Sequence, residues 1–248
     1  MDWLACEFRQ PGSMTQQAQA WSTKRLHRLI MLSAAYRRQS LPSVANTKID
    51  PENRHLWRWM PRRLEGEAIR DSFLMVANQL DRTLGGPSVN ATNGPSNRRS
   101  LYLRQQRYIL PATLAMFDAP VANEACTRRH TSTVPLQPLH LLNNAEYLSR
   151  AKAFAARVTE RAGDDNTNQI ESAFALALTR PPSVDEIAAA RKFLETIASS
   201  DNNETAPVVQ RASGTVASAK ESKLKKPSPG LIQFCQALMN ANEFIFIE

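Results

Sequence analysis

Acidic and basic side chains recur along residues 61–88, PRRLEGEAIRDSFLMVANQLDRTLGGPS. Glu67 and Asp71 lie four residues apart, about one helical turn, so they could together bind a metal ion or carry acid–base chemistry. Arg63 and Arg70 each lie three or four residues from Glu67, which is the spacing of ion pairs along a helix surface. The segment contains no histidine. Because ion-pair networks often imitate reactive sites, the spacing favours an ion-paired face.

A second polar segment, CTRRHTSTVPLQPLHLLNN, covers residues 126–144. Four of its side chains directly precede an expected helix: Arg128, Arg129, His130 and Thr131. With the free N–H groups of a helix start, such side chains could bind a carboxylate, phosphate or sulfate. Capping is the commoner use of polar residues there, with Ser132 or Thr133 as the N-cap. The sequence therefore favours capping, and it favours pairing of these arginines with the acids of residues 61–88.

The three cysteines, Cys6, Cys126 and Cys235, lie far apart and form no CxxC or CxxCH motif. This spacing argues against a zinc site or a covalently attached haem. Cys126 could join His130 and His140 in a metal triad, or pair with a histidine as a nucleophile. The spacing matches no known site, and an isolated cysteine commonly behaves as a small apolar residue. We therefore expect neither a metal nor another cofactor.

The 248 residues carry a net charge of +8, so an anionic partner must be considered. The basic residues are scattered and lack the interleaved aromatic residues of nucleic-acid-binding motifs, so we expect general surface charge, or a face that meets an acidic domain, rather than a nucleic-acid site. No apolar run approaches the roughly 18 residues of a transmembrane segment. The opening MDWLACEF lacks the basic region of a secretory signal peptide. We expect the chain to be a piece of a longer protein or a truncated reading frame.

The elements that must position these polar segments are predicted to be helices. Periodicity and capping residues predict a mainly α fold, an irregular domain of about six to eight helices with at most a small β element. The expected helices cover residues 2–9, 21–38, 50–59, 61–84, 135–162, 166–178, 183–199 and 231–242, with a shorter helical turn at 112–117. A strand is expected over residues 100–107, where apolar and polar side chains alternate.

Two of these helices carry the clearest local signals. The helix that is expected to end at Gly85-Gly86-Pro87 has four apolar side chains on one face: Ile69, Phe73, Val76 and Leu80. Ser183 followed by Glu186 forms a capping-box pattern at the start of the helix over 183–199.

We expect residues 1–200 and 229–248 to form a single helical domain. Residues 201–228 have almost no large apolar side chain, so we expect them to be a disordered insertion. The apolar end of the chain, residues 244–247, is expected to dock in the core.

Several segments, in the same order along the chain, carry a resemblance to one family. They are WSTKRLHRLIMLSAAYR (21–37), DPENRHLWRWMPRRLEGEAIRD (50–71), QLD…LGGPS (79–88), RRSLYL (98–103), FDAP (117–120), CTRRHTSTVPLQPLHLLNN (126–144), AFALALTRPPSVDEI (173–187) and CQALMNANEFIFIE (235–248). They resemble domain of unknown function 1553, the C-terminal domain of planctomycete cytochrome-associated proteins. In those proteins the domain follows a cytochrome-c-like module and another uncharacterised domain, both of which this sequence lacks.

The resemblance implies an exported or periplasmic setting and upstream domains as partners, but it brings no established activity. The leading hypothesis is therefore a non-catalytic helical module that packs against such domains or another protein. The alternative is a hydrolase acting on an anionic or sugar polymer. Its candidate residues are Glu67, Asp71, Asp118, Arg128, Arg129 and His130, and it requires the two polar segments to meet in one pocket.

Overall fold

The computed structural model of the chain describes residues 2–10, 20–90, 96–107, 109–123, 125–201 and 226–247. Within these ranges the protein is mainly helical with one two-stranded sheet, which confirms the predicted fold class. Most of the expected insertion, residues 202–225, lies outside the described ranges. The chain divides into two compact units, unit 1 (residues 1–62) and unit 2 (residues 63–247). The expectation of a single domain over residues 1–200 and 229–248 stays a prediction.

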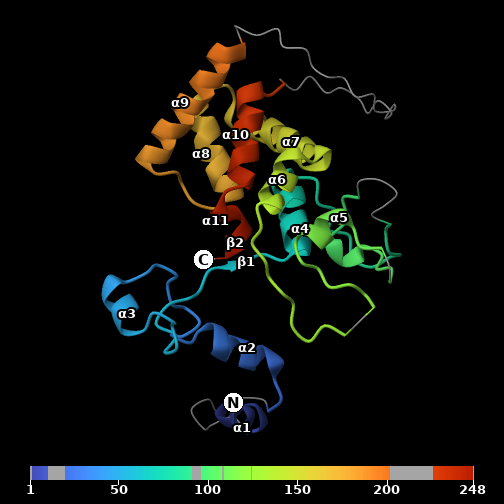
Figure 1. Cartoon of the computed structure of the whole chain (residues 1–248), viewed down its shortest axis with the longest axis vertical. Coiled ribbons are helices and arrows are strands. Elements are labelled where there is room, and N and C mark those ends of the chain that lie inside the picture. Colours follow the sequence, from blue (N-terminus) through green and yellow to red (C-terminus); the bar gives the residue numbers. More distant parts are fainter. Residues whose placement is uncertain are drawn as a thin grey trace. The chain divides into compact units, whose positions relative to one another are not determined.

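The α-helices and strands of both units are labelled in Figure 1. Unit 1 contains α1 (Asp2–Arg9), α2 (Thr23–Met31) and α3 (Val44–Ile49). Unit 2 contains α4 (Gly66–Val76), the 3₁₀ turn η2 (Ser100–Tyr102), α5 (Ala112–Met116), α6 (Leu136–Asn143), α7 (Ala145–Ala162), α8 (Asn166–Ala177), α9 (Val184–Asp201), α10 (Pro229–Met239) and α11 (Asn242–Ile245). The sheet pairs β1 (Arg62–Arg63), at the boundary of the units, with β2 (Phe246–Ile247).

Unit 1 is held together by polar contacts. Arg25 on α2 donates to the Glu7 carboxylate on α1 at 2.5 Å. After α3, Asp50 accepts hydrogen bonds from the backbone N–H groups of Arg54 and His55 at 3.0 and 2.9 Å. The hydrogen bond from His55, with that from Arg54, holds the pKa of Asp50 below its usual value, although partial desolvation opposes this. A polar turn therefore organises the end of this unit.

Unit 1 has no apolar core within its described residues, 2–10 and 20–62. The buried side chains in those ranges are Asp50 and Asn53, both polar. Large apolar side chains are instead exposed: Trp3, Trp21, Met31, Leu32, Tyr36, Leu41, Val44, Ile49, Leu56 and Met60. Unit 1 thus lacks the apolar burial that usually offsets the conformational entropy lost on folding.

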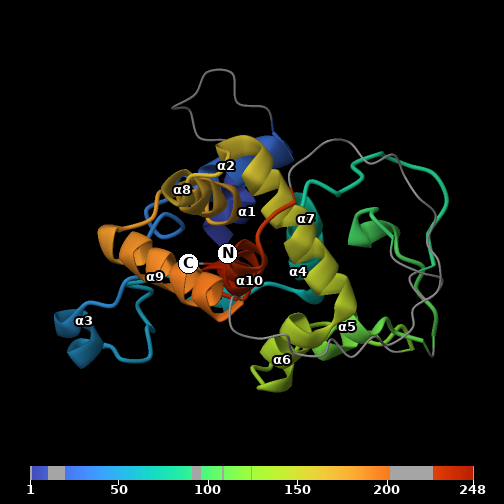
Figure 2. The ribbon, with the colours of Figure 1, turned by 90° about the horizontal axis from the view of Figure 1, so that it is seen from above.

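Unit 2 has a continuous apolar core around α7. Its residues Ala151, Phe154, Ala155 and Val158 follow helical spacing and are fully buried. Helix α10 packs against α7, α8 and α9, and it lies between α7 and α9 in Figures 1 and 2. Cys235 of α10 is buried here as a free thiol, whereas Cys6 and Cys126 are free and exposed.

Only the first half of the apolar end, residues 244–247, is buried in the core, and Ile247 is 43% exposed. Phe244 and Ile245 of α11 are buried, and the ring of Phe244 meets that of Phe73 edge-on at 5.4 Å. The Leu64 N–H donates to the Ile245 carbonyl at 2.8 Å, next to the β1–β2 pairing. Docking of the last helix therefore also fixes the chain that leads into α4.

The capping box at the start of α9 is confirmed. Ser183 N–H donates to the Glu186 carboxylate at 2.7 Å, and Glu186 N–H donates to Ser183 Oγ at 3.2 Å. Arg180 donates to the same carboxylate and also to Glu243 of α11, at 2.6 to 2.8 Å. One guanidinium thus joins the starts of α9 and α11.

Replacing Glu186 by glutamine should reduce stability at neutral pH but not at pH 2. Hydrogen bonds from Arg180 and then from Ser183 lower the pKa of Glu186 from 4.5 to about 2. Because this folded-state pKa is depressed, the stabilisation is present above pH 4.5 and is lost as the pH falls towards 2. The side chain is 35% exposed, so solvent screening limits the effect to about 1 kcal/mol.

Urea unfolding at pH 7, 4 and 2.5 measures this difference. The exposed Glu195 on the same helix supplies the control variant, Glu195→Gln. A difference between wild type and Glu186→Gln that does not shrink from pH 7 to 2.5 would contradict the expected dependence.

Helix α4 is shorter than predicted at both ends. Residues 61–65 are not helical, because Arg63 lies in β1 and Leu64 pairs with the C-terminal segment. The helix ends at Val76, since Asn78 adopts a left-handed conformation with φ of 56°, and not at Gly85. Ile69, Phe73 and Val76 form the buried stripe as expected. Leu80 lies beyond the helix.

Three other predicted boundaries in the described residues are wrong. Helix α2 stops at Met31, and the Ser33 hydroxyl then bonds to the Ile30 carbonyl. No helix covers residues 50–59, where Asn53 and Leu56 both have positive φ. The single helix expected over 135–162 is split at Asn144, which ends α6 and caps α7 by accepting from the Glu146 N–H.

The strand expected over residues 100–107 is also absent. The chain forms the short turn η2 there, followed by an isolated bridge between Val89 and Leu103.

Candidate functional site

Most of the polar residues selected from the sequence fall into three separate clusters of unit 2. They are named here after their central residues: the Arg70 cluster, the Asp118 cluster and the Arg129 cluster.

The Arg70 cluster joins α4 to η2. Arg70 is buried, and its Nη1 donates to Ser100 Oγ at 3.1 Å and to the Arg98 carbonyl at 3.0 Å, while Nη2 donates to the Ser96 carbonyl. Asp71 accepts from Ser100 N–H at 2.8 Å and from Ser100 Oγ at 2.7 Å. Both α4 side chains therefore hold residues 96–100 in place, and the Asp71 carboxylate is engaged in that role.

The Asp118 cluster joins β1 to the segment before α6. Arg63, whose side chain is only 4% exposed, donates through Nη2 to Asp118 at 2.7 Å. Asp118 also accepts from the N–H and Oγ of Ser132, both at 2.8 Å. Burial raises the pKa of Asp118, but these hydrogen bonds outweigh burial, and its pKa lies below the usual value. Asp118 is therefore ionised and shared between two donors at neutral pH.

Close packing of α4 against α5 brings Asp118 close to Arg63. Gly66 opens α4, and a Cβ at this position would lie 3.0 Å from Phe117 Cβ and 3.4 Å from Leu114 Cα. A larger residue would push α5 away and displace Asp118, which follows directly in a left-handed conformation with φ of 61°. The glycine thus places the carboxylate within reach of Arg63.

The Arg129 cluster lies at the surface. Arg129 Nη1 donates to Glu65 at 3.0 Å and to Glu67 at 2.9 Å, and Nη2 donates to the other oxygen of Glu67 at 3.1 Å. Hydrogen bonding to Glu67 raises the pKa of Arg129. A small pocket of about 220 Å³ is lined by Glu67, Arg129 and Cys126, among others. The two polar segments therefore meet here, but through a closed ion pair.

The remaining candidates do not join these clusters. Arg128, His130 and Thr131 are exposed, and the described part of the chain offers them no hydrogen bond or ion pair. His140 is half-buried on α6 beside Thr113 Oγ1 at 3.2 Å. No group of three or more His, Cys, Asp or Glu side chains among the described residues is placed to hold a metal ion.

The capping role expected for Ser132 or Thr133 is wrong. Helix α6 starts after Pro135 and has no side-chain cap, and Ser132 binds Asp118 instead. The expected pairing between the two polar segments holds for Glu67, through Arg129. The pairing of Arg63 and Arg70 with Glu67 along one helix face is wrong: Arg63 binds Asp118, and Arg70 bonds to residues 96–100 and to the adjacent Asp71.

Sequence reasoning missed three partners in these networks: Glu65, Ser100 and Gln137. The Gln137 amide donates to the Met116 and Ser132 carbonyls at 3.1 and 3.2 Å, which ties α6 to the Asp118 cluster. Nothing in the local sequence marks these residues, because Glu65, Ser100 and Gln137 have partners that lie 64, 29 and 21 residues away along the chain.

Comparisons with known proteins identify a family and bring no activity. A family model described as Protein of unknown function (DUF1553) matches residues 1–194, more than three quarters of the chain. No curated protein and no solved structure matches it. No helix in the described part of the chain combines the length and apolar character needed to cross a bilayer. The chain belongs to the DUF1553 family.

Proposed function

We propose that this chain is a non-catalytic interaction module in which unit 1 meets an acidic partner protein. The observation that carries the proposal is the exposed apolar surface of unit 1. Trp3 and Leu32 are 63% and 62% exposed, and a groove of about 800 Å³ runs between α1 and α2. Contiguous exposed apolar surface with a polar rim is typical of protein-binding sites.

The charge of unit 1 supports an acidic partner. Residues 1–62 hold ten lysines and arginines but four acids, so six of the chain's eight net positive charges lie in this quarter of the sequence. Arg25 and Arg28 line the groove beside its apolar side chains. A partner with an acidic rim would therefore complement both the charge and the apolar floor.

The carboxylates of the three polar clusters are hydrogen-bonded within the chain, which supports a non-catalytic role. Asp71, Asp118 and Glu67 are each engaged by donors of the same chain at 2.7 to 3.1 Å. A catalytic carboxylate needs access to substrate and a partner that moves a proton. These three side chains instead connect elements of unit 2.

We further propose that the partner is the upstream part of an exported, cytochrome-associated protein, as the resemblance implies. The test is a calorimetric titration of this full chain with the cytochrome-c-like and companion domains of a family member. We expect binding that weakens as salt is added, because charges contribute, and a higher melting temperature for the mixture.

A matched pair of variants tests whether the partner binds at the groove of unit 1. Leu32→Glu places a carboxylate in the groove and, if the groove binds an acidic partner, should abolish binding. Val184→Glu alters an 83% exposed apolar residue of unit 2 and should leave binding unchanged. Absence of binding, or equal binding by Leu32→Glu and wild type, would reject the proposal.

The alternative, a hydrolase acting on an anionic or sugar polymer, draws on the pocket beside Glu67, Cys126 and Arg129. Hydrolysis of a glycosidic bond generally uses two carboxyl groups placed around the bond. Glu67 is the carboxylate that lines this pocket, and both of its oxygens accept from Arg129. The geometry therefore supports the interaction module better.

A further inference from the structure

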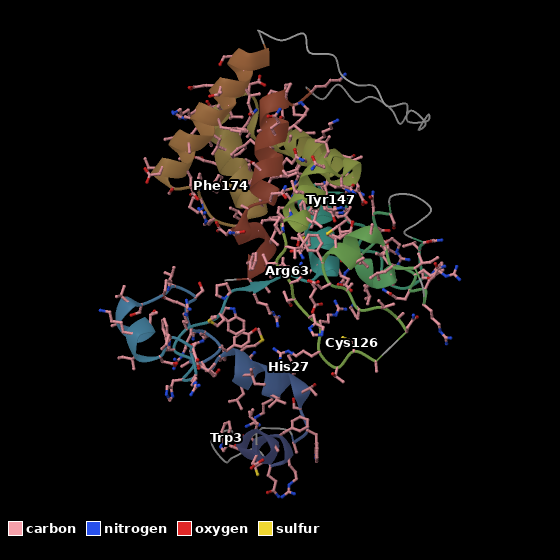
Figure 3. The ribbon with its side chains drawn as sticks, in the orientation of Figure 1. Trp3, His27, Arg63, Cys126, Tyr147 and Phe174 are labelled. Atoms are coloured by element: carbon pink, nitrogen blue, oxygen red, sulfur yellow. The ribbon has the colours of Figure 1, made fainter. Side chains whose placement is uncertain are left out.

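A second pocket of unit 2, distinct from the groove of unit 1, combines apolar walls with a buried cation. Its volume is about 300 Å³, and its lining includes Arg63, Phe117, Val134, Leu141, Asn240 and Ile245. Figure 3 labels Arg63 where β1 meets the C-terminal elements. Apolar pockets with a few convergent polar groups are the usual form of small-molecule sites.

Arg63 has more donors than the protein uses. Its Nη2 donates to Asp118 and, at 3.4 Å, to the Phe117 carbonyl. Its Nε and Nη1 are buried without a hydrogen-bond partner. A guanidinium carries five N–H groups, so three of them are unsatisfied at a position where each costs stability.

Comparison with other arginines shows which of the unpaired nitrogens distinguishes Arg63. Nε is also unpaired in Arg58, Arg98 and Arg150, so that feature alone is not distinctive. Among the described residues, however, Nη1 of Arg63 is the only terminal guanidinium nitrogen that is buried and unpaired. In the similarly buried Arg70, both terminal nitrogens have acceptors. Arg63 is therefore distinguished by a buried terminal nitrogen, Nη1, that lacks an acceptor.

Asp118 balances the charge of Arg63, but it accepts from only one of its nitrogens, Nη2. Its carboxylate also accepts from Ser132, and burial lowers the pKa of Arg63 even though Asp118 opposes that shift. A further acceptor beside Nε and Nη1 would supply the missing hydrogen bonds, and a carboxylate can accept from two N–H groups of one guanidinium at once.

Asn240 offers a complementary group in the same pocket. Its Nδ2 donates to the Gln236 carbonyl at 2.8 Å, which assigns the amide orientation. Its Oδ1 is buried without a partner. A ligand that has a hydroxyl or N–H group in addition to an anion could satisfy this acceptor as well.

We propose that this pocket binds a small amphiphilic carboxylate, with its anionic end beside Arg63 and its apolar body against Phe117, Leu141 and Ile245. The unpaired nitrogens are out of contact with bulk water, so the ligand reaches them when the coil at Thr133–Pro135 shifts. That coil forms one wall of the pocket and leads into α6 without a side-chain cap. The volume suits a compact ligand such as a medium-chain or aromatic acid.

Octanoate is the probe, and octan-1-ol and acetate are its controls. Octanol keeps the apolar body without the charge, and acetate keeps the charge without the body. With the full chain, calorimetry and thermal melting should show saturable binding of octanoate with a dissociation constant on the order of 1 mM or tighter. Neither control compound should produce a saturable shift.

Three variants test the location. Arg63→Met should weaken octanoate binding by about tenfold or more, through loss of a charge-assisted hydrogen bond. Val134→Trp fills the pocket from its 38% exposed rim without altering Arg63 or Asp118, and it should also abolish binding. Arg150→Met removes a buried arginine that does not line the pocket, so it should lose stability but keep octanoate binding.

If Arg63→Met fails to fold, octanoate binding by Val134→Trp still tests whether the ligand occupies this pocket. The proposal is overturned if octanoate does not bind wild type saturably, if octanol binds equally well, or if Val134→Trp binds octanoate as wild type does.

Discussion

Replacement of Asp118 by asparagine should lower the free energy of unfolding of unit 2 by about 3 kcal/mol. The side chain of Arg63 is 4% exposed, and Asp118 is the carboxylate that pairs with it. Asparagine has the same shape and tolerates the left-handed backbone at this position, so the change removes the charge and little else. The loss arises because a buried guanidinium is left without a counter-ion.

Far-UV circular dichroism during urea unfolding is the appropriate measurement. All four tryptophans lie in residues 1–62, so tryptophan fluorescence follows unit 1 and not the helices of unit 2. The control is Glu65→Gln, which removes a 62% exposed partner of Arg129 and should cost less than about 0.5 kcal/mol. Equal losses for the two variants would show that burial of the Arg63 pair adds nothing to its stability.

Replacement of Phe73 by alanine should destabilise unit 2 by about 3–5 kcal/mol. The Phe73 side chain is 1% exposed, and its ring meets Tyr147 and Phe244 edge-on, at 4.6 and 5.4 Å. It therefore connects α4, α7 and α11 at once. Truncation removes both ring contacts and leaves a cavity where three helices meet.

Met75→Ala is the matched control for Phe73→Ala. It lies on the same helix, but its side chain is 53% exposed, so we expect a loss below about 1 kcal/mol. The same far-UV unfolding curves measure both variants. If Phe73→Ala cost no more than Met75→Ala, the junction of α4, α7 and α11 would not be part of the core.

Features that depend on nearby residues could be predicted from the sequence. The capping box at Ser183 and Glu186 needs partners only three residues apart, and both of its hydrogen bonds form. The apolar stripe of α4 was recognisable for the same reason, because helical spacing alone places Ile69 and Phe73 on one face. Mainly helical architecture follows from several such local patterns.

Features that depend on distant residues could not be predicted. Helical spacing continues from Ile69 to Leu80, yet the chain leaves the helix at Asn78. Residues before Gly66 are extended, because Leu64 pairs with Ile245, about 180 residues later. A tertiary contact therefore set the start of this helix, whereas its end at Val76 carried a local signal, since asparagine is a common left-handed residue at helix C-termini.

In the candidate site, too, local features could be predicted from the sequence and distant contacts could not. The polar segments were identified correctly as charged and mutually attractive, and Glu67 does meet Arg129. Asp118, which pairs with Arg63, and Ser100, which accepts from Arg70, lie 55 and 30 residues away along the chain. Arg62 and Arg63 stand side by side before α4, and nothing in their sequence context tells which of the two is buried. The split at Asn144 did carry a signal, because asparagine is a preferred N-cap.

The placement of the three thiols gives the molecule two kinds of sulfur chemistry. Cys6 and Cys126 are exposed, one in each unit, so oxidants and alkylating reagents can reach them in the native protein. Burial raises the pKa of Cys235 and keeps its sulfur within the α7–α10 packing. In an oxidising compartment the two exposed thiols would be the points of covalent cross-linking between molecules, while the third would become reactive only in molecules whose helical core had opened.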